Sequence, residues 1–129
     1  MKIRTLALAG FALVCAAPAF AHHSFAMFDR QKLVTMSGTV REFEWTNPHV
    51  WIHMMVPDAG KQVEWSFEMQ AIGTNAALGW RPDSVKPGDK VTIEFYPLKD
   101  GSRGGQLAAA VLADGKRLGG PVRRPAAQD

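Results

Sequence analysis

The amino-acid sequence predicts an all-β domain with one short helix. Its 129 residues are enough for one domain and too few for two ordinary domains joined by a linker. A hydrophobic share of 47% beside 21% charged residues is typical of a folded globular chain. Apolar and polar residues alternate in short runs that glycine, proline and asparagine separate, which is the pattern of half-buried strands joined by turns.

Five runs are predicted to form strands, and we place them at residues 33–45, 49–56, 62–69, 90–96 and 106–113. Turn residues lie between them at 46–48, 57–60 and 86–89. The first run changes parity near Gly38, which predicts a glycine bend or bulge there. Between the third and fourth runs, Thr74 or Asn75 can cap a short helix over residues 76–78 that stops at Gly79.

The position of the helix indicates the architecture. A helix between the third and fourth of five strands is the order of an OB-like barrel, whose long first strand bends around both sheets. A small β-sandwich is the alternative. We expect residues 22–113 to form this domain, with residues 22–32 as an N-terminal arm lying on the barrel. Residues 114–129, rich in glycine, proline, arginine and alanine, are expected to be a flexible tail.

The first 21 residues have the pattern of a secretory signal peptide. Lys2 and Arg4 precede an apolar, uncharged stretch at residues 5–17, and a small-x-small ending then predicts cleavage between Ala21 and His22. The stretch is shorter than the roughly 20 apolar residues that a membrane span needs. We therefore expect a periplasmic or secreted protein with no stable membrane span after cleavage.

Cleavage would change what the chain can bind. It would remove Cys15, the one cysteine, and with it any thiolate ligand or disulfide. It would also remove two of the fifteen basic residues and none of the twelve acidic ones, which leaves a net charge of +1 with histidine neutral. This charge and the expected location outside the cytoplasm argue against nucleic acid as a binding partner. We expect a metal ion or an exported protein as the partner, and no nucleic acid.

Several short motifs resemble a family of small exported bacterial proteins of unknown function. They are His-His-Ser-Phe-Ala at residues 22–26, Trp-Thr-Asn-Pro-His at 45–49, Gly-Trp at 79–80 and Lys-Pro-Gly-Asp at 86–89. The resemblance covers residues 22–113. It implies an exported, β-rich module and supplies no activity, so the function has to be argued from candidate site residues.

The histidines carry the first functional hypothesis. A mature N-terminal His22 would offer its α-amine and its imidazole to one metal ion, and nitrogen ligands without thiolates favour Cu(II), with Zn(II) and Ni(II) behind. The arrangement is similar in chemistry to the N-terminal histidine of periplasmic copper carriers and copper-dependent polysaccharide monooxygenases. The candidate metal ligands are His22, His23, His49 and His53.

Strand geometry limits which histidines can act together. His49 and His53 share a parity, but four residues of extended chain separate them by about 13 Å, so at most one completes a site with His22 or His23. We favour His49, because it lies beside a turn that the arm can reach, and His53 is the second choice. Asp29, Glu42 and Glu44 are further oxygen partners. A solvated chain end with no metal is the alternative interpretation of His22 and His23.

A second hypothesis rests on tryptophan. His49, Trp51 and His53 alternate with Val50, Ile52 and Met54, so they face outward if the aliphatic set is the core. Trp45 and Trp51 are then a face for a small ligand or a protein partner. Alternatively, Phe25 and Phe28 of the arm cover both tryptophans.

Three functions follow from these hypotheses: copper handling, metal-free ligand binding, and a copper-dependent oxidoreductase. No serine has the context of a nucleophile elbow, and Glu64 and Glu68 are expected on a solvated strand face, so binding is favoured over catalysis.

Overall fold

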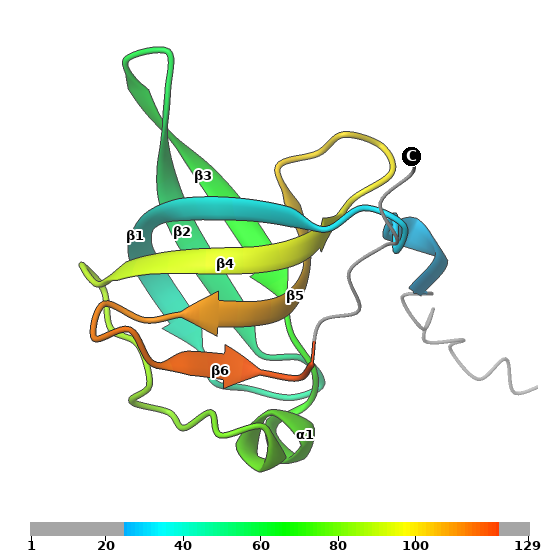
Figure 1. The fold of residues 1–129 in the computed structure, drawn as a ribbon, viewed down its shortest axis with the longest axis vertical. Coiled ribbons are helices and arrows are strands. Elements are labelled where there is room, and N and C mark those ends of the chain that lie inside the picture. The colour runs from blue at the N-terminus through cyan, green and yellow to red at the C-terminus, as the bar shows by residue number, and fades with distance from the viewer. Residues whose placement is uncertain (1–24, 122–129) are drawn as a thin grey trace, which may run out of the picture.

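The computed structural model describes residues 25–121 and confirms the predicted fold class. The elements in chain order are the 3-10 turn η1 Phe25–Met27, β1 Val34–Glu44, β2 Trp51–Asp58, β3 Lys61–Glu68, α1 Ile72–Ala77, β4 Lys90–Pro97, β5 Gly104–Val111 and β6 Arg117–Gly119. The strands follow the order β3-β2-β1-β4-β5-β6, and a parallel pairing of β3 with β5 closes the barrel (Figure 1). The observed architecture is thus the OB-like barrel rather than the sandwich.

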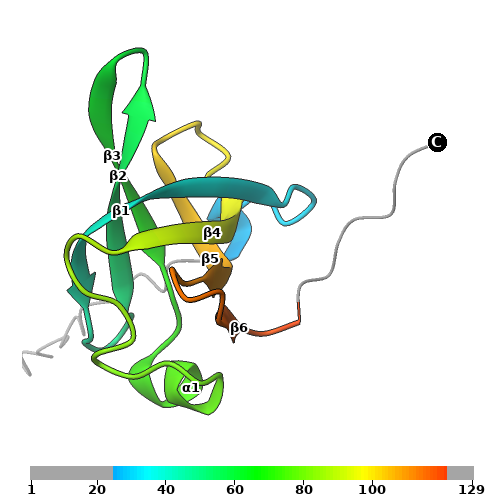
Figure 2. The same cartoon turned by 60° about the vertical axis from the view of Figure 1, so that its left-hand side comes forward.

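The long first strand serves both halves of the barrel. Residues 34–39 of β1 pair with β4, and residues 39–44 pair with β2, so the strand bends from one half into the other (Figure 2). The pairing register shifts between Val40 and Glu42, not at Gly38. Gly38 has a different role, because a Cβ atom there would lie 2.6 Å from the Met55 carbonyl oxygen. The glycine permits the close approach of β1 and β2 at the bend.

The hairpin between β2 and β3 has a two-residue turn. Both turn residues have positive φ, 47° at Ala59 and 79° at Gly60, as the tight hairpin turns that match strand twist require. The predicted turn at residues 57–60 was therefore too wide, and Asp58 pairs with Lys61 at the ends of the strands. The hairpin extends beyond the body of the barrel at the upper left of Figure 1.

The helix starts earlier than predicted. It covers Ile72–Ala77, and its N-cap residue is Ala71, so neither Thr74 nor Asn75 caps it. Asn47 caps the helix from a distance instead, since its Oδ1 accepts the Ile72 amide at 3.0 Å. The helix ends before Gly79, whose φ of 95° confirms the predicted stop.

The C-terminal region holds a strand that the sequence did not predict. β6 lies within residues 114–129, which we expected to be a flexible tail, and it pairs with β5. Leu118 is the reason, because it is 4% exposed and completes the core. Leu118 is a single apolar residue in a glycine-rich stretch, so the sequence has no alternating pattern there that would predict a strand.

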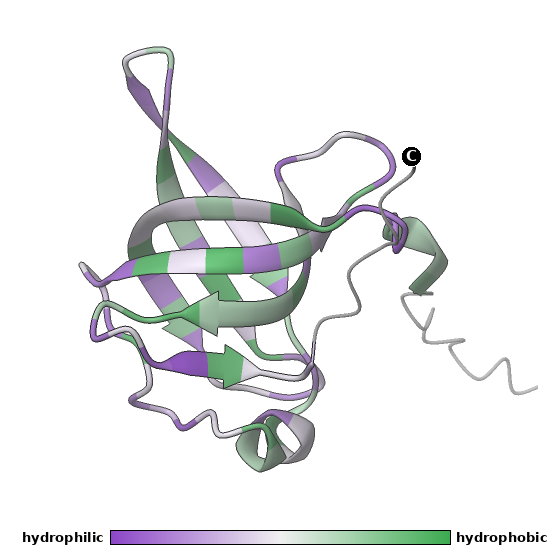
Figure 3. Ribbon diagram, in the orientation of Figure 1, coloured by the Kyte–Doolittle hydropathy of each residue, from purple (hydrophilic) through white to green (hydrophobic). Residues whose placement is uncertain are grey.

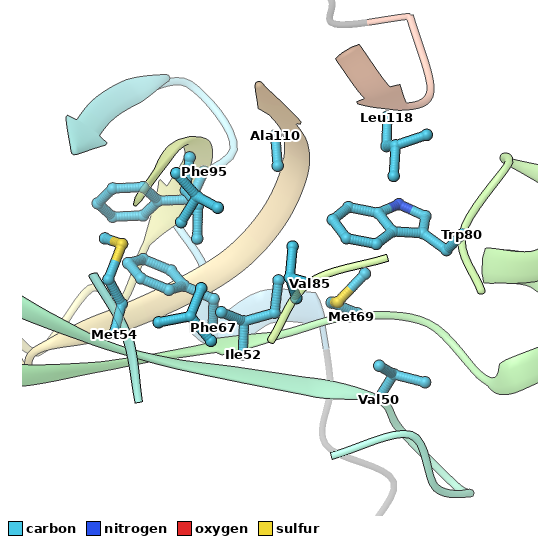
Figure 4. Packing of buried hydrophobic residues seen from close by; sticks show 13 residues of the cluster. Val50, Ile52, Met54, Phe67, Met69, Trp80, Val85, Phe95, Ala110 and Leu118 are labelled. Atoms are coloured by element: carbon cyan, nitrogen blue, oxygen red, sulfur yellow. The ribbon is translucent and has the colours of Figure 1, made fainter. Parts of the chain in front are cut away.

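The core fills the barrel from end to end. Apolar and polar residues alternate clearly along β4 (Figure 3), and Val50, Ile52 and Met54 are completely buried, as predicted. Figure 4 shows Trp80 beside Leu118 at one end of the core. Within residues 25–121, no helix is both long enough and apolar enough to span a membrane.

Candidate functional site

The side of β2 opposite the core carries the candidate residues, as the alternation predicted. Trp51 and His53 are half-buried there, while Ile52 between them is fully buried. The register places Trp51 between Glu44 and Glu68, and His53 between Glu42 and Ser66. We call this surface the outer face, and define it by Glu42, Glu44, Trp51, His53, Glu64, Ser66 and Glu68.

Both ring nitrogens of His53 have partners on the outer face. Nε2 lies 3.0 Å from Glu44 Oε1, and Nδ1 lies 2.7 Å from Ser66 Oγ. The Trp51 ring is nearly parallel to the imidazole, with ring centroids 6.2 Å apart. The His53 side chain is only 15% exposed. A metal ion could bind His53 only by displacing one of these partners.

His49 has a different environment, just before β2. Its Nδ1 lies 3.0 Å from the Met69 carbonyl oxygen and 3.4 Å from Glu68 Oε1. A carbonyl oxygen only accepts hydrogen bonds, so Nδ1 carries the proton, and in the neutral imidazole Nε2 presents its lone pair. Nε2 has no hydrogen-bond partner among residues 25–121. At 34% exposure, the side chain remains accessible.

Glu68 is buried, although the sequence predicted that it lies on a solvated strand face. The residue is 7% exposed, because it lies where β3 meets β5 and the barrel closes. Its partner across that pairing is Gln106, which is 5% exposed. A buried carboxylate needs polar partners, and the contact with His49 supplies one.

The N-terminal arm docks on the barrel beside this closure. The Asp29 amide donates to the Pro97 carbonyl oxygen at 2.8 Å, and Phe28 forms a β-bridge with Leu98. Arg30 Nη1 donates to Gln106 Oε1 at 2.6 Å, and the guanidinium stacks 4.6 Å from the Tyr96 ring centroid. The arm is thus connected, through Gln106 and Glu68, to the part of the barrel that holds His49.

The two tryptophans of the predicted ligand face do not share a surface. Trp45 packs against the core with Phe43, at a ring-centroid distance of 5.7 Å. Only Trp51 of the two belongs to the outer face. Phe28 bridges to Leu98, and Arg30 contacts Tyr96 and Gln106, so this part of the arm docks on β4, β5 and the loop that joins them.

Most of the sequence motifs have structural roles. Asn47 of Trp-Thr-Asn-Pro-His caps α1, and Trp80 of Gly-Trp is fully buried. In Lys-Pro-Gly-Asp, Gly88 has a φ of 95° and its amide donates to the Val40 carbonyl oxygen. His49, the motif histidine within residues 25–121, uses only Nδ1 in the fold, and its Nε2 has no hydrogen-bond partner there.

Ala21, His22 and His23 lie outside the described residues, so the predicted cleavage site and two predicted ligands remain predictions. Within residues 25–121, no group of three or more histidine, aspartate or glutamate side chains is placed to hold a metal ion. A hollow of about 630 Å³ lies elsewhere, over β1 and β4, and its lining includes Ser37 and Lys90 but no residue of the outer face.

The topology defines an OB-type barrel, and the sequence identifies the family: residues 11–108 match DUF6152, a family of unknown function, and the chain belongs to it. No curated protein matches the chain. Among solved structures, two crystal forms of the mitochondrial single-stranded DNA-binding protein Rim1 from S. cerevisiae are similar in fold. Form 2 has a TM-score of 0.49 and 13% identity over 69% of this chain and 96% of that chain. Form 1 has a TM-score of 0.49 and 10% identity over 70% and 97%.

The comparison corrects one prediction. From net charge and expected export, we excluded nucleic acid as a partner. The similar solved structures are those of single-stranded DNA-binding proteins, so this exclusion is wrong. Net charge describes the whole chain and does not report the ligand class of one surface.

Proposed function

We propose that this protein is an exported OB-type binding module that holds Cu(II) through His22, assisted by His23 and His49, and that it handles copper rather than turning over a substrate. The observation that carries the proposal is the orientation of His49. Metal-binding histidines commonly donate one ring N–H to a carbonyl or carboxylate oxygen and bind the metal through the other nitrogen. His49 has this arrangement, with Nδ1 facing Met69 and Glu68.

The docked arm supports the participation of His22. In the sequence, His22 precedes Phe25, the first described residue of the arm, by three positions. The arm in turn is fixed by Arg30 to Gln106, the neighbour of Glu68 across the strand pairing. An α-amine, an N-terminal imidazole and His49 Nε2 together make a nitrogen-rich set, which suits Cu(II).

The test is a Cu(II) titration of protein exported by its own leader, followed by electron paramagnetic resonance. Intact mass must first show that the chain begins at His22. The matched control carries one glycine ahead of His22, which keeps the imidazole and moves the α-amine. One-to-one binding with a nitrogen-rich spectrum, altered in the control, supports the proposal. Equal or negligible binding by both proteins contradicts it.

A second candidate function is metal-free ligand binding on the outer face. Its basis is the Trp51 ring, which is half-buried and parallel to His53 between two carboxylate-bearing strands. Flat, partly exposed aromatic rings stack on sugars, bases and protein side chains. Quenching of tryptophan fluorescence by a neutral oligosaccharide or a single-stranded oligonucleotide, lost in Trp51→Ala, would favour this function.

The third candidate function is a copper-dependent oxidoreductase. Ascorbate-driven peroxide production by the copper-loaded protein would favour it.

A further inference from the structure

We propose that Ser66 is an activated nucleophile with His53 as its general base, and that the outer face accepts an acyl group from a neutral carboxylic ester. The basis is a linear arrangement of three side chains from three adjacent strands. Ser66 Oγ lies 2.7 Å from His53 Nδ1, and His53 Nε2 lies 3.0 Å from Glu44 Oε1. A nucleophile in contact with a base that a third group orients is the arrangement that activates serine hydroxyls. The proposal is independent of the copper site.

Glu44 fixes which nitrogen of His53 carries the proton. An ionised carboxylate only accepts hydrogen bonds, so Nε2 must be the donor to Glu44. In the neutral imidazole, Nδ1 is then the acceptor and faces the Ser66 hydroxyl. This is the tautomer that a general base for Ser66 requires, and Glu44 is its positioning residue.

The surroundings keep Nδ1 available to Ser66. The second carboxylate nearby, Glu64, has its Oε1 3.7 Å from Nδ1, beyond hydrogen-bond distance. Arg41 holds Glu64, with its Nε 2.8 Å from Oε2. The strand register also fixes the pair, since His53 and Ser66 are direct neighbours across β2 and β3. Serine and histidine therefore face each other on a rigid support.

The face also suggests the class of substrate. The Trp51 ring, parallel to the imidazole, offers an apolar surface for a small acyl group next to His53. Glu44 and Glu64 lie on either side of His53 and would repel an anionic acid or phosphate. A neutral ester with a small acyl group fits both conditions.

The reaction conserves atoms and protons with water as the second reactant. Ser66 Oγ forms a bond to the carbonyl carbon while His53 Nδ1 takes the hydroxyl proton. The bond between that carbon and the leaving oxygen then breaks, and the proton passes to the leaving group or to solvent. Water attacks the acyl-serine with His53 again accepting a proton, the Oγ–carbon bond breaks, and the proton returns to Ser66.

The probe is p-nitrophenyl acetate, added to the full exported protein in the presence of a chelator, so that bound copper makes no contribution. Two readouts are followed: the release of p-nitrophenolate, and the acetylated residue, mapped by mass spectrometry after acid quenching. We expect acetylation at Ser66. The Ser66→Ala variant should lose site-dependent release, and His53→Gln should reduce it at least about 100-fold.

Ser37→Ala is the matched control. Ser37 also lies on a strand and pairs with another side chain, Thr92 Oγ1 at 2.7 Å, but it has no histidine partner and is more exposed than Ser66. Its loss should leave the rate unchanged. In Glu44→Gln, the ¹⁵N shifts of His53 should show a changed tautomer along with slower release. Unchanged release by Ser66→Ala, or acetylation spread over lysines and Ser37 without Ser66, would overturn the proposal.

Discussion

Glu68 Oε1 lies 3.4 Å from His49 Nδ1, and this contact connects the end of β3 to the segment that precedes β2. Glu68 is buried at the closure of the barrel, whereas His49 is accessible on one side. The Glu68 carboxylate therefore fixes the orientation of the His49 imidazole from the buried side of the ring. The contact also distinguishes His49 from His53, although the two share a parity in the sequence. Both ring nitrogens of His53 have hydrogen-bond partners, whereas Nε2 of His49 has none within residues 25–121.

This distinction predicts different effects on copper binding. His49→Gln should weaken Cu(II) binding at least about tenfold and remove one nitrogen from the paramagnetic resonance spectrum. Glu68→Gln should weaken binding by about 10- to 100-fold, because it removes the group that orients the ligand. His53→Gln is the control and should leave affinity unchanged. A competition titration measures all three, and an equal loss in His49→Gln and His53→Gln would exclude His49 as the specific ligand.

The docking of the arm should depend on Arg30. Arg30→Ala removes the bond to Gln106 and the stacking on Tyr96, together a loss of about 1–2 kcal/mol. The arm should then open more often, and amide exchange should accelerate about tenfold at Asp29 and Lys99, whose N–H groups bond across this contact. Lys32→Ala, which removes an exposed ion pair with Asp29, should change exchange little. Equal exchange in both variants would mean that Arg30 does not secure the arm.

The faces of the strands could be predicted from the sequence, because alternation reports burial directly. It placed Ile52 in the core and Trp51 and His53 outside, as the structure has them. Trp45 was misplaced: it packs against the core beside Phe43, with the ring centroids 5.7 Å apart. Trp45 shares the parity of Phe43, which pairs with the buried Ile52, so alternation continued to residue 45 would have placed it on the core side.

Contacts between distant residues could not be predicted in this way. Arg30 and Gln106 are 76 positions apart, and the cap of α1 by Asn47 crosses 25 positions. Nothing local in the sequence links such pairs.

The contact between His53 and Ser66 is a different case. A two-residue turn at Ala59 and Gly60 fixes the register that brings them together, so a narrower turn assignment would have revealed it.

Asp100 offers a pH-dependent prediction in the loop between β4 and β5. The Ser102 hydroxyl and the Ser102 amide both donate to Oδ1 of Asp100 and lower its pKa below the ordinary value. The hydroxyl has the larger effect on this pKa. A lowered folded-state pKa stabilises the fold above the unfolded pKa, and this contribution is lost as pH falls through the folded pKa. Ser102→Ala should raise the pKa of Asp100 in a carbon-13 titration, whereas Ser37→Ala should not move it. An unchanged titration in Ser102→Ala would show that the hydroxyl has no part in the shift.

The bend of β1 should depend on the absence of a side chain at Gly38. A Cβ atom there would lie 2.6 Å from both Met54 Cγ and the Met55 carbonyl oxygen, and the backbone oxygen cannot move without disturbing the pairing of β1 with β2. Gly38→Ala should therefore lower the free energy of unfolding by about 1–3 kcal/mol. Gly73→Ala is the matched control, since its added Cβ would meet nothing within 4 Å and lies in α1, where alanine is favoured by up to about 1 kcal/mol. Urea unfolding of both variants measures the difference, and equal stabilities would show that the two strands can separate at the bend without cost.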